Sequence, residues 1–401
     1  MANNSYDYLI VGGGLAAASA VEGIRELDQE GTILLLGKEQ RLPYHRPPLS
    51  KKLWSGEKAV DEIFVHDEQF YADHGVQLAL GAEATALDTR ARSVRDDRGN
   101  TYAYRKLLLA TGGYPRTLSI PSGDFAGVFY YRYLDHYLAL RPLAQPGKSA
   151  LVIGGGFIGS EMAAALNKVG VEVTMLFPEP YLGQRVFPES LGRALLEDYR
   201  RRGVKVAAGD VPASTSLHAG KLLTRTRNGA EIESDFIVVG VGIVPDTRLA
   251  ETAGLDVRDG ILVNEYLATS APDVYAAGDV AFFPYAALHA LTRIEHWDNA
   301  LSQGKHAGRN MAGAEEPFTY MPYFFSDLFD FGYEAVGDTD SRLETFADWQ
   351  EENKTGVVYY LKEGKVRGAM MCNLWDKVDA ARALILEGRS VGPDDLRGAI
   401  A

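Results

Sequence analysis

The stretch Tyr8-Leu9-Ile10-Val11-Gly12-Gly13-Gly14-Leu15-Ala16-Ala17 decides the fold that we expect. A short apolar run predicts a buried strand, and the alanine-rich segment after the glycines predicts a helix to about Leu27. The turn has the form G-x-G-x-x-A. Gly12 permits the tight turn, Gly14 lets a pyrophosphate approach the backbone, and Ala17 lets helix and strand pack closely. Phosphates then meet N–H groups at the positive end of the helix.

A second buried-type strand follows at Ile33–Leu36 and completes a βαβ unit. A carboxylate is expected at the end of that strand, where it holds ribose hydroxyls. Glu39 stands there, beside the basic Lys38, and we assign both to the nucleotide site. The sequence therefore predicts a first dinucleotide-binding domain.

The same pattern returns at Ala150–Ile153, followed by Gly154-Gly155-Gly156-Phe157-Ile158-Gly159, a complete G-x-G-x-x-G. A helix is expected to about Val169, and the next strand runs over Val171–Phe177. Glu179 after that strand can reach a ribose hydroxyl, which favours NADH. Arg185 nearby could instead bind the 2′-phosphate of NADPH, so that nucleotide stays an alternative.

Two such fingerprints in one chain predict an α/β protein with two Rossmann-like dinucleotide-binding domains. Beyond about Thr319 the apolar pattern alternates, as in Gly356–Tyr360 and Val366–Met370, which predicts a small C-terminal α+β domain. The arrangement is glutathione-reductase-like. The chemistry that requires two dinucleotides is hydride transfer from a nicotinamide to a flavin, so we expect FAD and NADH as cofactors.

Composition excludes several other classes. The chain has 401 residues, 46% of them hydrophobic and 24% charged, which suits a globular protein of two or three domains. Its net charge of −13 opposes binding to nucleic acid or to an anionic membrane. No apolar run is long enough to cross a bilayer, and no metal site is expected. The first strand starts near Asp7, so we expect a cytoplasmic protein, and a mitochondrial one only if a targeting segment is missing.

The chain has one cysteine, Cys372, so it can form no internal disulfide. Flavoenzymes that reduce disulfides need a cysteine pair or one reactive cysteine beside the flavin. We expect Cys372 to be a small buried core residue instead.

Between the two fingerprints the chain reads Leu42-Pro43-Tyr44-His45-Arg46-Pro47-Pro48-Leu49-Ser50-Lys51. This string resembles a signature of the ferredoxin-reductase-like FAD/NAD-linked oxidoreductases. Within them, later motifs are most similar to the apoptosis-inducing-factor type. Those motifs are Ala110–Arg116, Gly154–Glu161, Phe177–Glu179, Gly278-Asp279, Glu295–Asp298, Ser326–Leu328 and Gly332–Ala335.

The resemblance implies an FAD domain formed by residues 1–117 and 245–311, an NAD domain at 118–244, and a C-terminal domain at 312–401 for dimerisation or closure of the active site. It implies FAD contacts at Gly12, Gly13, Gly14, Leu15, Ala16, Ala17, Lys38, Glu39, Arg46, Lys51, Ala84, Thr111, Gly112, Arg132, Asp279, His296 and Trp297. It implies NAD contacts at Gly155, Gly156, Phe157, Ile158, Glu179, Gly242, Glu295, Phe325, Glu334 and Asn373.

By the same resemblance, three residues carry the chemistry. Lys51 and Glu161 form an ion pair under the flavin, where the lysine stabilises negative charge on the reduced ring and the glutamate orients the lysine. Phe157 is a gate that nicotinamide displaces. From the residues alone, Glu161 could instead be an exposed helix residue and Phe157 a core aromatic.

The chain also departs from the apoptosis-inducing-factor pattern. Phe325 replaces a stacking tryptophan, and Gln184 replaces a lysine for the nucleotide. The segment Leu53–Tyr71 lacks an inserted hairpin, and Asp338–Lys354 lacks a long insert. These losses put redox-driven rearrangement in doubt.

Three functions follow as hypotheses. The first is an NADH oxidoreductase of the apoptosis-inducing-factor type, with a long-lived charge-transfer complex and an unknown acceptor: a quinone, oxygen or a small redox protein. The second is an NADH-dependent reductase of a ferredoxin or rubredoxin. The third is an NADH-responsive redox sensor whose reduced form becomes a homodimer and recruits partners.

Overall fold

The computed structural model describes residues 4–120 and 125–400, and it divides into two compact units. The first unit comprises Met1–His45, Val60–Tyr114 and Val244–Pro322. The second comprises Arg46–Ala59, Pro115–Ile243 and Tyr323–Ala401. The chain changes from one unit to the other five times, and two of these boundaries fall within the short strands β7 (Gly113–Pro115) and β16 (Ile243–Pro245).

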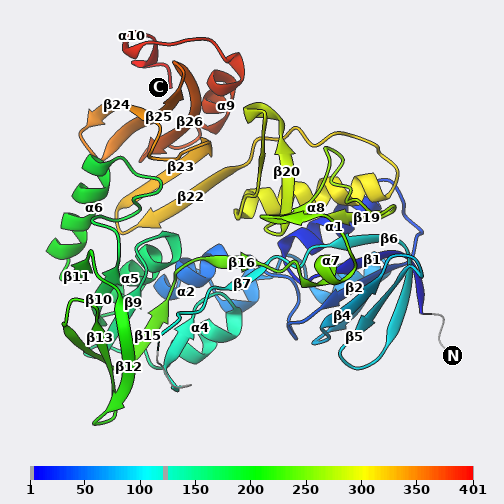
Figure 1. The fold of residues 1–401 in the computed structure, drawn as a ribbon, viewed down its shortest axis with the longest axis horizontal. Helices are drawn as coiled ribbons and strands as arrows, with labels where there is room; N and C mark the ends of the chain where they lie inside the picture. Colours follow the sequence, from blue (N-terminus) through cyan, green and yellow to red (C-terminus); the bar gives the residue numbers. More distant parts are fainter. Residues whose placement is uncertain (1–3, 121–124, 401) are drawn as a thin grey trace. The chain divides into compact units, whose positions relative to one another are not determined.

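The first unit is built on a seven-stranded sheet of order β3-β2-β1-β6-β5-β4, with β19 also pairing to β6 (Figure 1). Its parallel strands form a doubly wound sheet, because βαβ crossovers place helices against it. They are β1 (Ser5–Val11), β2 (Ile33–Gly37), β3 (Val76–Leu80), β6 (Thr101–Leu109) and β19 (Val274–Ala276). The antiparallel strands are β4 (Ala84–Asp88) and β5 (Ser93–Asp96).

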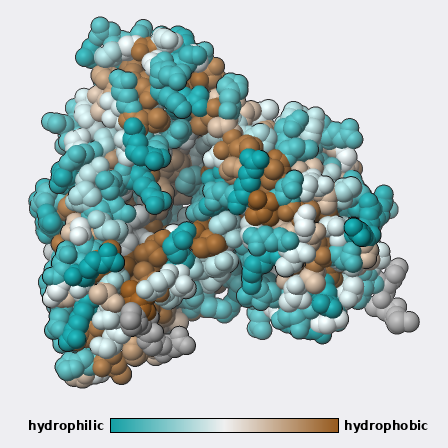
Figure 2. Space-filling model, viewed as in Figure 1, coloured by the Kyte–Doolittle hydropathy of each residue, from teal (hydrophilic) through white to brown (hydrophobic). Residues whose placement is uncertain are grey.

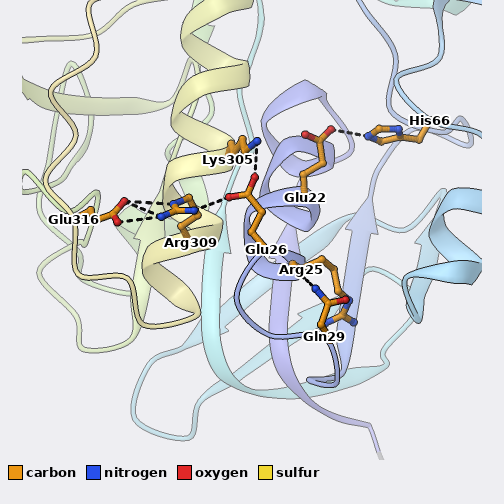
Figure 3. Close-up of polar contacts among 8 residues, drawn as sticks. All are labelled: Glu22, Arg25, Glu26, Gln29, His66, Lys305, Arg309 and Glu316. Carbon is orange, nitrogen blue, oxygen red and sulfur yellow. Dashed lines mark hydrogen bonds and ion pairs between the residues drawn. The ribbon is translucent and has the colours of Figure 1, made fainter.

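Helices α1 (Leu15–Arg25) and α8 (Trp297–Met311) pack against each other in this unit. Ion pairs join the C-terminal end of α1 to the C-terminal half of α8, as Figure 3 shows. Glu26, the C-cap of α1, accepts from Lys305 and from Arg309 at 2.6 Å each, and Arg309 also pairs with Glu316 at 3.0 Å. The helix that begins at the first glycine turn is therefore anchored by a helix from much later in the chain.

The rest of the first unit surrounds these layers. It has a four-stranded sheet of order β17-β18-β20-β21, formed by Val257–Arg258, Gly260–Leu262, Ala281–Tyr285 and Ala290–Thr292. Its shorter helices are η2 (Val60–Ile63), α3 (Glu68–Asp73), α7 (Arg248–Thr252) and η3 (Ala286–Leu288).

The second unit repeats the parallel design with the order β11-β10-β9-β15-β8. The strands are β8 (Val128–Tyr130), β9 (Ser149–Ile153), β10 (Glu172–Phe177), β11 (Lys205–Ala208) and β15 (Phe236–Val239). Its helices are η1 (Pro47–Ser50), α2 (Lys52–Ser55), α4 (Leu134–Leu140), α5 (Phe157–Lys168) and α6 (Glu189–Arg201). A separate antiparallel sheet contains β12 (Pro212–His218), β13 (Lys221–Thr226) and β14 (Glu231–Ser234).

The C-terminal part of this unit is a five-stranded antiparallel sheet of order β22-β23-β26-β25-β24. Its strands are β22 (Tyr323–Leu328), β23 (Phe331–Gly337), β24 (Glu344–Glu351), β25 (Thr355–Lys362) and β26 (Lys365–Cys372). Helices α9 (Val378–Glu387) and α10 (Pro393–Leu396) follow. The predicted fold class, two Rossmann-like domains with a C-terminal α+β domain, is confirmed, whereas the three domain boundaries stay a prediction.

Polar side chains cover most of the face that Figure 2 shows, in keeping with a chain in which 24% of residues are charged. Among the described residues, no helix combines the length and the apolar character that crossing a membrane requires.

Candidate functional site

The first glycine turn leaves room where a pyrophosphate would approach. Gly12 has φ +138°, and a Cβ there would lie 2.6 Å from the carbonyl carbon of Ala110, so this position requires glycine. A Cβ on Gly14 would meet no heavy atom of the described chain within 4 Å. Gly14 is also the N-cap of α1, and no side chain caps it. Small residues here therefore keep a space open beside a helix N-terminus, which fits the diphosphate of FAD.

The acid after β2 is held in a defined position. The Tyr44 hydroxyl donates to Glu39 Oε2 at 2.6 Å. Lys38 is turned elsewhere, because its ammonium pairs with Glu83 at 2.9 Å and its side chain is 69% exposed. The ribose contacts of Glu39 and Lys38 both stay predictions, and the exposed, paired Lys38 has the less support.

Other predicted FAD residues of the first unit lie at strand ends. Thr111 donates its hydroxyl to the Asp246 carbonyl at 2.7 Å, and Gly112 has φ +64°. Ala84 begins β4, the edge strand of the sheet.

The start of α8 gathers the predicted residues Asp279, Glu295, His296 and Trp297. Trp297 Nε1 donates to His45 Nδ1 at 2.9 Å, and Arg293 donates to the Asp279 carbonyl at 3.2 Å. Arg293 also pairs with Glu295. Burial lowers the pKa of His296 to about 4, so its imidazole is neutral at pH 7.

The second glycine turn repeats the geometry of the first. Gly154 has φ +122°, and a Cβ on Gly155 would lie 2.8 Å from the Phe177 ring. A Cβ on Gly159 would lie 2.7 Å from the carbonyl carbon of Gly154. Gly156 faces open space, with no described heavy atom within 4 Å of an added Cβ. This turn therefore also fits a pyrophosphate.

The first residues of α5 point outward. Phe157 is 39% exposed and Ile158 is 37% exposed. The Phe157 ring meets Phe324 edge to face at 5.7 Å. Phe157 is not a core aromatic, and its role as a gate stays a prediction.

Glu161 lies on the buried side of the same helix. It is 6% exposed, so the alternative of an exposed helix residue is wrong. Lys51 Nζ lies 3.1 Å from Glu161 Oε1, and Ser326 donates to the same oxygen at 2.6 Å. The Ser50 hydroxyl donates to Oε2. The buried carboxylate is therefore paired and hydrogen-bonded, as a buried charge requires.

The two serines were not predicted as site residues. Ser50 directly precedes Lys51, and Ser326 opens the Ser326–Leu328 motif, but nothing in a linear pattern shows that both meet Glu161. The negative charge of Glu161 adds to burial in raising the pKa of Tyr199 and of Tyr333 well above the usual value. Both tyrosine hydroxyls therefore stay neutral at pH 7.

Lys51 also contacts two side chains of β22. Its Nζ lies 4.4 Å from the centre of the Phe325 ring and 3.5 Å from Asp327 Oδ2. Phe325 stands opposite Glu334 in the β22–β23 register. Burial, with a contribution from Asp376, raises the pKa of Glu334. The structure thus brings Lys51, Glu161, Phe325 and Glu334 together.

The remaining predicted residues of the second unit have backbone partners. Arg46 donates to the Arg132 carbonyl at 2.9 Å. Asn373, at φ +47°, accepts from Gly332 N at 2.8 Å and donates to the Lys354 carbonyl at 3.1 Å. The carbonyl oxygen of Glu179, just beyond β10, accepts a hydrogen bond from the N–H of Gly209. Gly242 has a positive φ of +96°. The side chain of Asn373 therefore has a structural role, because it links the backbone of Gly332 to that of Lys354.

Cys372 is fully buried, and burial raises the pKa of its thiol. The described part of the chain contains no cluster of three His, Cys, Asp or Glu residues that could hold a metal ion. Neither a dithiol nor a metal centre accompanies the two glycine turns in these residues.

Two glycine turns of the dinucleotide-binding type, each at the carboxyl end of a parallel strand, are typical of an oxidoreductase that combines a flavin with a nicotinamide nucleotide. The chain belongs to the pyridine nucleotide-disulphide oxidoreductase family, whose pattern matches residues 6–304. The C-terminal pattern of mitochondrion-associated apoptosis-inducing factor matches residues 307–355.

Individual relatives agree. Mitochondrial apoptosis-inducing factor 1 of Dictyostelium discoideum is 34% identical over 96% of this chain and 79% of its own length. The ferredoxin–NAD(+) reductase component of the anthranilate 1,2-dioxygenase system of Burkholderia cepacia is 33% identical over 97% of this chain and 96% of its own. In the covalent putidaredoxin reductase–putidaredoxin complex, the matching chain has a TM-score of 0.92, with 29% identity over 98% of this chain and 95% of that chain.

The predicted resemblance is therefore confirmed. The chain is an FAD-containing NADH oxidoreductase that uses FAD and NAD(H).

Proposed function

We propose that this protein is an NADH-dependent reductase that passes electrons directly to a small iron–sulfur protein of the ferredoxin type. The observation that carries the proposal is the burial of its single cysteine. Because Cys372 is inaccessible and has no second cysteine to pair with, electrons cannot leave through a protein disulfide. They must pass to an external acceptor without a thiol relay.

The electrons and protons of the proposed reaction balance. One NADH loses two electrons as a hydride and becomes NAD⁺. Two oxidised iron–sulfur proteins take one electron each, and one proton is released. FAD supplies the conversion between the two-electron donor and the one-electron acceptor.

The chain's own residues bind and orient the reactants. The turn at Gly12–Ala17 holds the FAD diphosphate and Glu39 its ribose, while the turn at Gly154–Gly159 and Glu179 hold NADH. Lys51 places a fixed positive charge at the reacting end, and Glu161 with its two serines keeps that ammonium in position. Phe157 covers the nicotinamide position until NADH displaces it.

Several observations favour an iron–sulfur acceptor over a quinone, oxygen or a sensor role. Two relatives above 30% identity are ferredoxin reductase components, and each is covered over 96% of its length. Phe325 is a smaller stacking surface than tryptophan, which weakens a long-lived charge-transfer complex and the NADH-dependent dimer that would follow from it. A cytoplasmic location remains part of this proposal.

The proposal is tested by anaerobic mixing of the purified yellow protein with NADH or NADPH, followed by an oxidised bacterial [2Fe–2S] ferredoxin. We expect rapid bleaching with NADH, slower bleaching with NADPH, and a return of the flavin spectrum as ferredoxin is reduced. Rubredoxin, a soluble quinone and air are the comparison acceptors. A broad long-wavelength band that outlasts every acceptor for minutes, together with a shift to dimer on gel filtration, would support the sensor and refute the reductase.

A further inference from the structure

The loop that follows the second ribose-binding position is held by the C-terminal sheet. We call Glu179–Phe187 the nucleotide loop. The carbonyl oxygens of three consecutive residues in it, Gln184, Arg185 and Val186, each accept a hydrogen bond from that sheet or the turn before β24. Ser341 donates its hydroxyl to Gln184 and its N–H to Arg185 at 3.0 Å. The Tyr360 hydroxyl donates to Val186 at 2.6 Å.

The loop is also fixed on its other side. Gly183, at φ +61°, donates its N–H to the carbonyl of Gly155 at 3.0 Å. Phe187 is buried and meets Tyr333 of β23 edge to face at 5.4 Å. One side of the nucleotide loop is therefore tied to the glycine turn and the other to the C-terminal sheet.

We propose that Ser341 and Tyr360 are positioning residues for the nicotinamide nucleotide, so that the C-terminal sheet forms part of the NADH site through the nucleotide loop. The inference rests on the proposed function, in which the second glycine turn and Glu179 bind NADH. Neither residue needs to touch the nucleotide. Each holds loop backbone beside the adenosine ribose, and preorganised backbone lowers the entropy cost of binding.

The experiment compares two adjacent tyrosines of β25. Successive residues of a strand point to opposite faces, so Tyr359→Phe removes an equally buried hydroxyl that does not reach the nucleotide loop. We expect Tyr360→Phe and Ser341→Ala each to raise the Kd and KM for NADH by about threefold to tenfold, the loss of one hydrogen bond. The kcat with ferricyanide at saturating NADH should stay unchanged, and Tyr359→Phe should leave Kd and KM unchanged.

A further measurement separates the outcomes. Amide hydrogen exchange over residues 179–187 should be faster in Tyr360→Phe and Ser341→Ala than in Tyr359→Phe. Folded variants with wild-type Kd and wild-type exchange would overturn the inference. Reduction of ferredoxin at saturating NADH tests the proposed function separately, since the positioning variants should retain it.

Discussion

A Cβ added to Gly304 of α8 would lie 2.7 Å from the Cα atom of Ala16 in α1, so the two helices meet backbone to backbone. Gly308 lies as close to Ala20, where the added atom would be 2.9 Å from the carbonyl carbon. Real Cβ atoms do not approach a backbone this closely. The first glycine turn therefore depends on two glycines in a helix far from it in sequence.

Gly304→Ala should accordingly separate α1 from α8. We expect overpacking to lower the free energy of unfolding by about 2 kcal/mol, and FAD to be retained poorly, because α1 carries the turn at its N-terminus. Thermal unfolding and the ratio of flavin to protein absorbance measure the two effects. Wild-type stability with full flavin content would show that α8 can move without cost.

Gly14→Ala provides the contrasting case. Its backbone has φ −102°, which alanine adopts, and an added Cβ meets no described atom within 4 Å. We expect unchanged stability of the protein without flavin but at least tenfold weaker FAD binding, because the methyl group occupies the space for the pyrophosphate. Gly156→Ala should do the same to NADH, raising its KM and leaving FAD content unchanged. A loss of stability in either variant would contradict this assignment of the open space.

Lys51 and Glu161 should behave as a coupled pair. A double-mutant cycle with Lys51→Met and Glu161→Gln should give a coupling free energy of about 2 kcal/mol in denaturant unfolding, because removing one partner leaves the other buried without its counter-charge. Lys51→Met should also slow flavin reduction by NADH more than Glu161→Gln does, since in the proposed function the ammonium is the group that stabilises the developing charge. Lys52→Met, at the exposed neighbouring position, is the matched control. Additive effects would make the pair structurally and chemically independent.

Much of the fold follows from the sequence because glycine turns are local. Gly12 and Gly154 have positive φ and directly follow apolar strands, so the start of each sheet is visible in about ten consecutive residues. Helix α5 ends within one residue of the predicted position, because Gly170 supplies the left-handed residue just beyond it.

The rest depends on contacts between distant segments. Glu161 meets Ser50 and Ser326, which lie 111 and 165 residues away, and no periodicity encodes that meeting. The bond from Tyr360 to Val186 spans 174 residues. Gly304 and Gly308 have helical spacing, and small residues four apart could have been taken as a sign of close helix packing. Their partners, Ala16 for Gly304 and Ala20 for Gly308, lie in a distant part of the sequence, so the spacing alone does not identify them.

Cys372 should not react with alkylating reagents and should take no part in electron transfer. Because the thiol is fully buried and its pKa is raised, the thiolate that alkylating reagents require is scarce in the folded protein. We expect iodoacetamide to leave NADH-dependent ferredoxin reduction unchanged over hours. Cys372→Ala should cost about 1 kcal/mol of stability through a small cavity without slowing electron transfer. Inactivation by iodoacetamide that NADH accelerates would indicate a thiol step and contradict direct transfer.

His296 should make the protein acid-sensitive. Burial lowers the pKa of His296 to about 4, against an ordinary value of 6.5, so the folded state favours the neutral ring. Above pH 6.5 both folded and unfolded states hold it neutral, and the folded state has its full stability. As the pH falls from 6.5 to 4, only the unfolded state takes up the proton, and about 3 kcal/mol of stability is lost.

Denaturant unfolding at a series of pH values measures the slope of the free energy of unfolding against pH. His296→Gln should flatten it in that window, whereas His218→Gln, at an exposed position, should not. An unchanged slope in His296→Gln would mean that other groups cause the acid sensitivity.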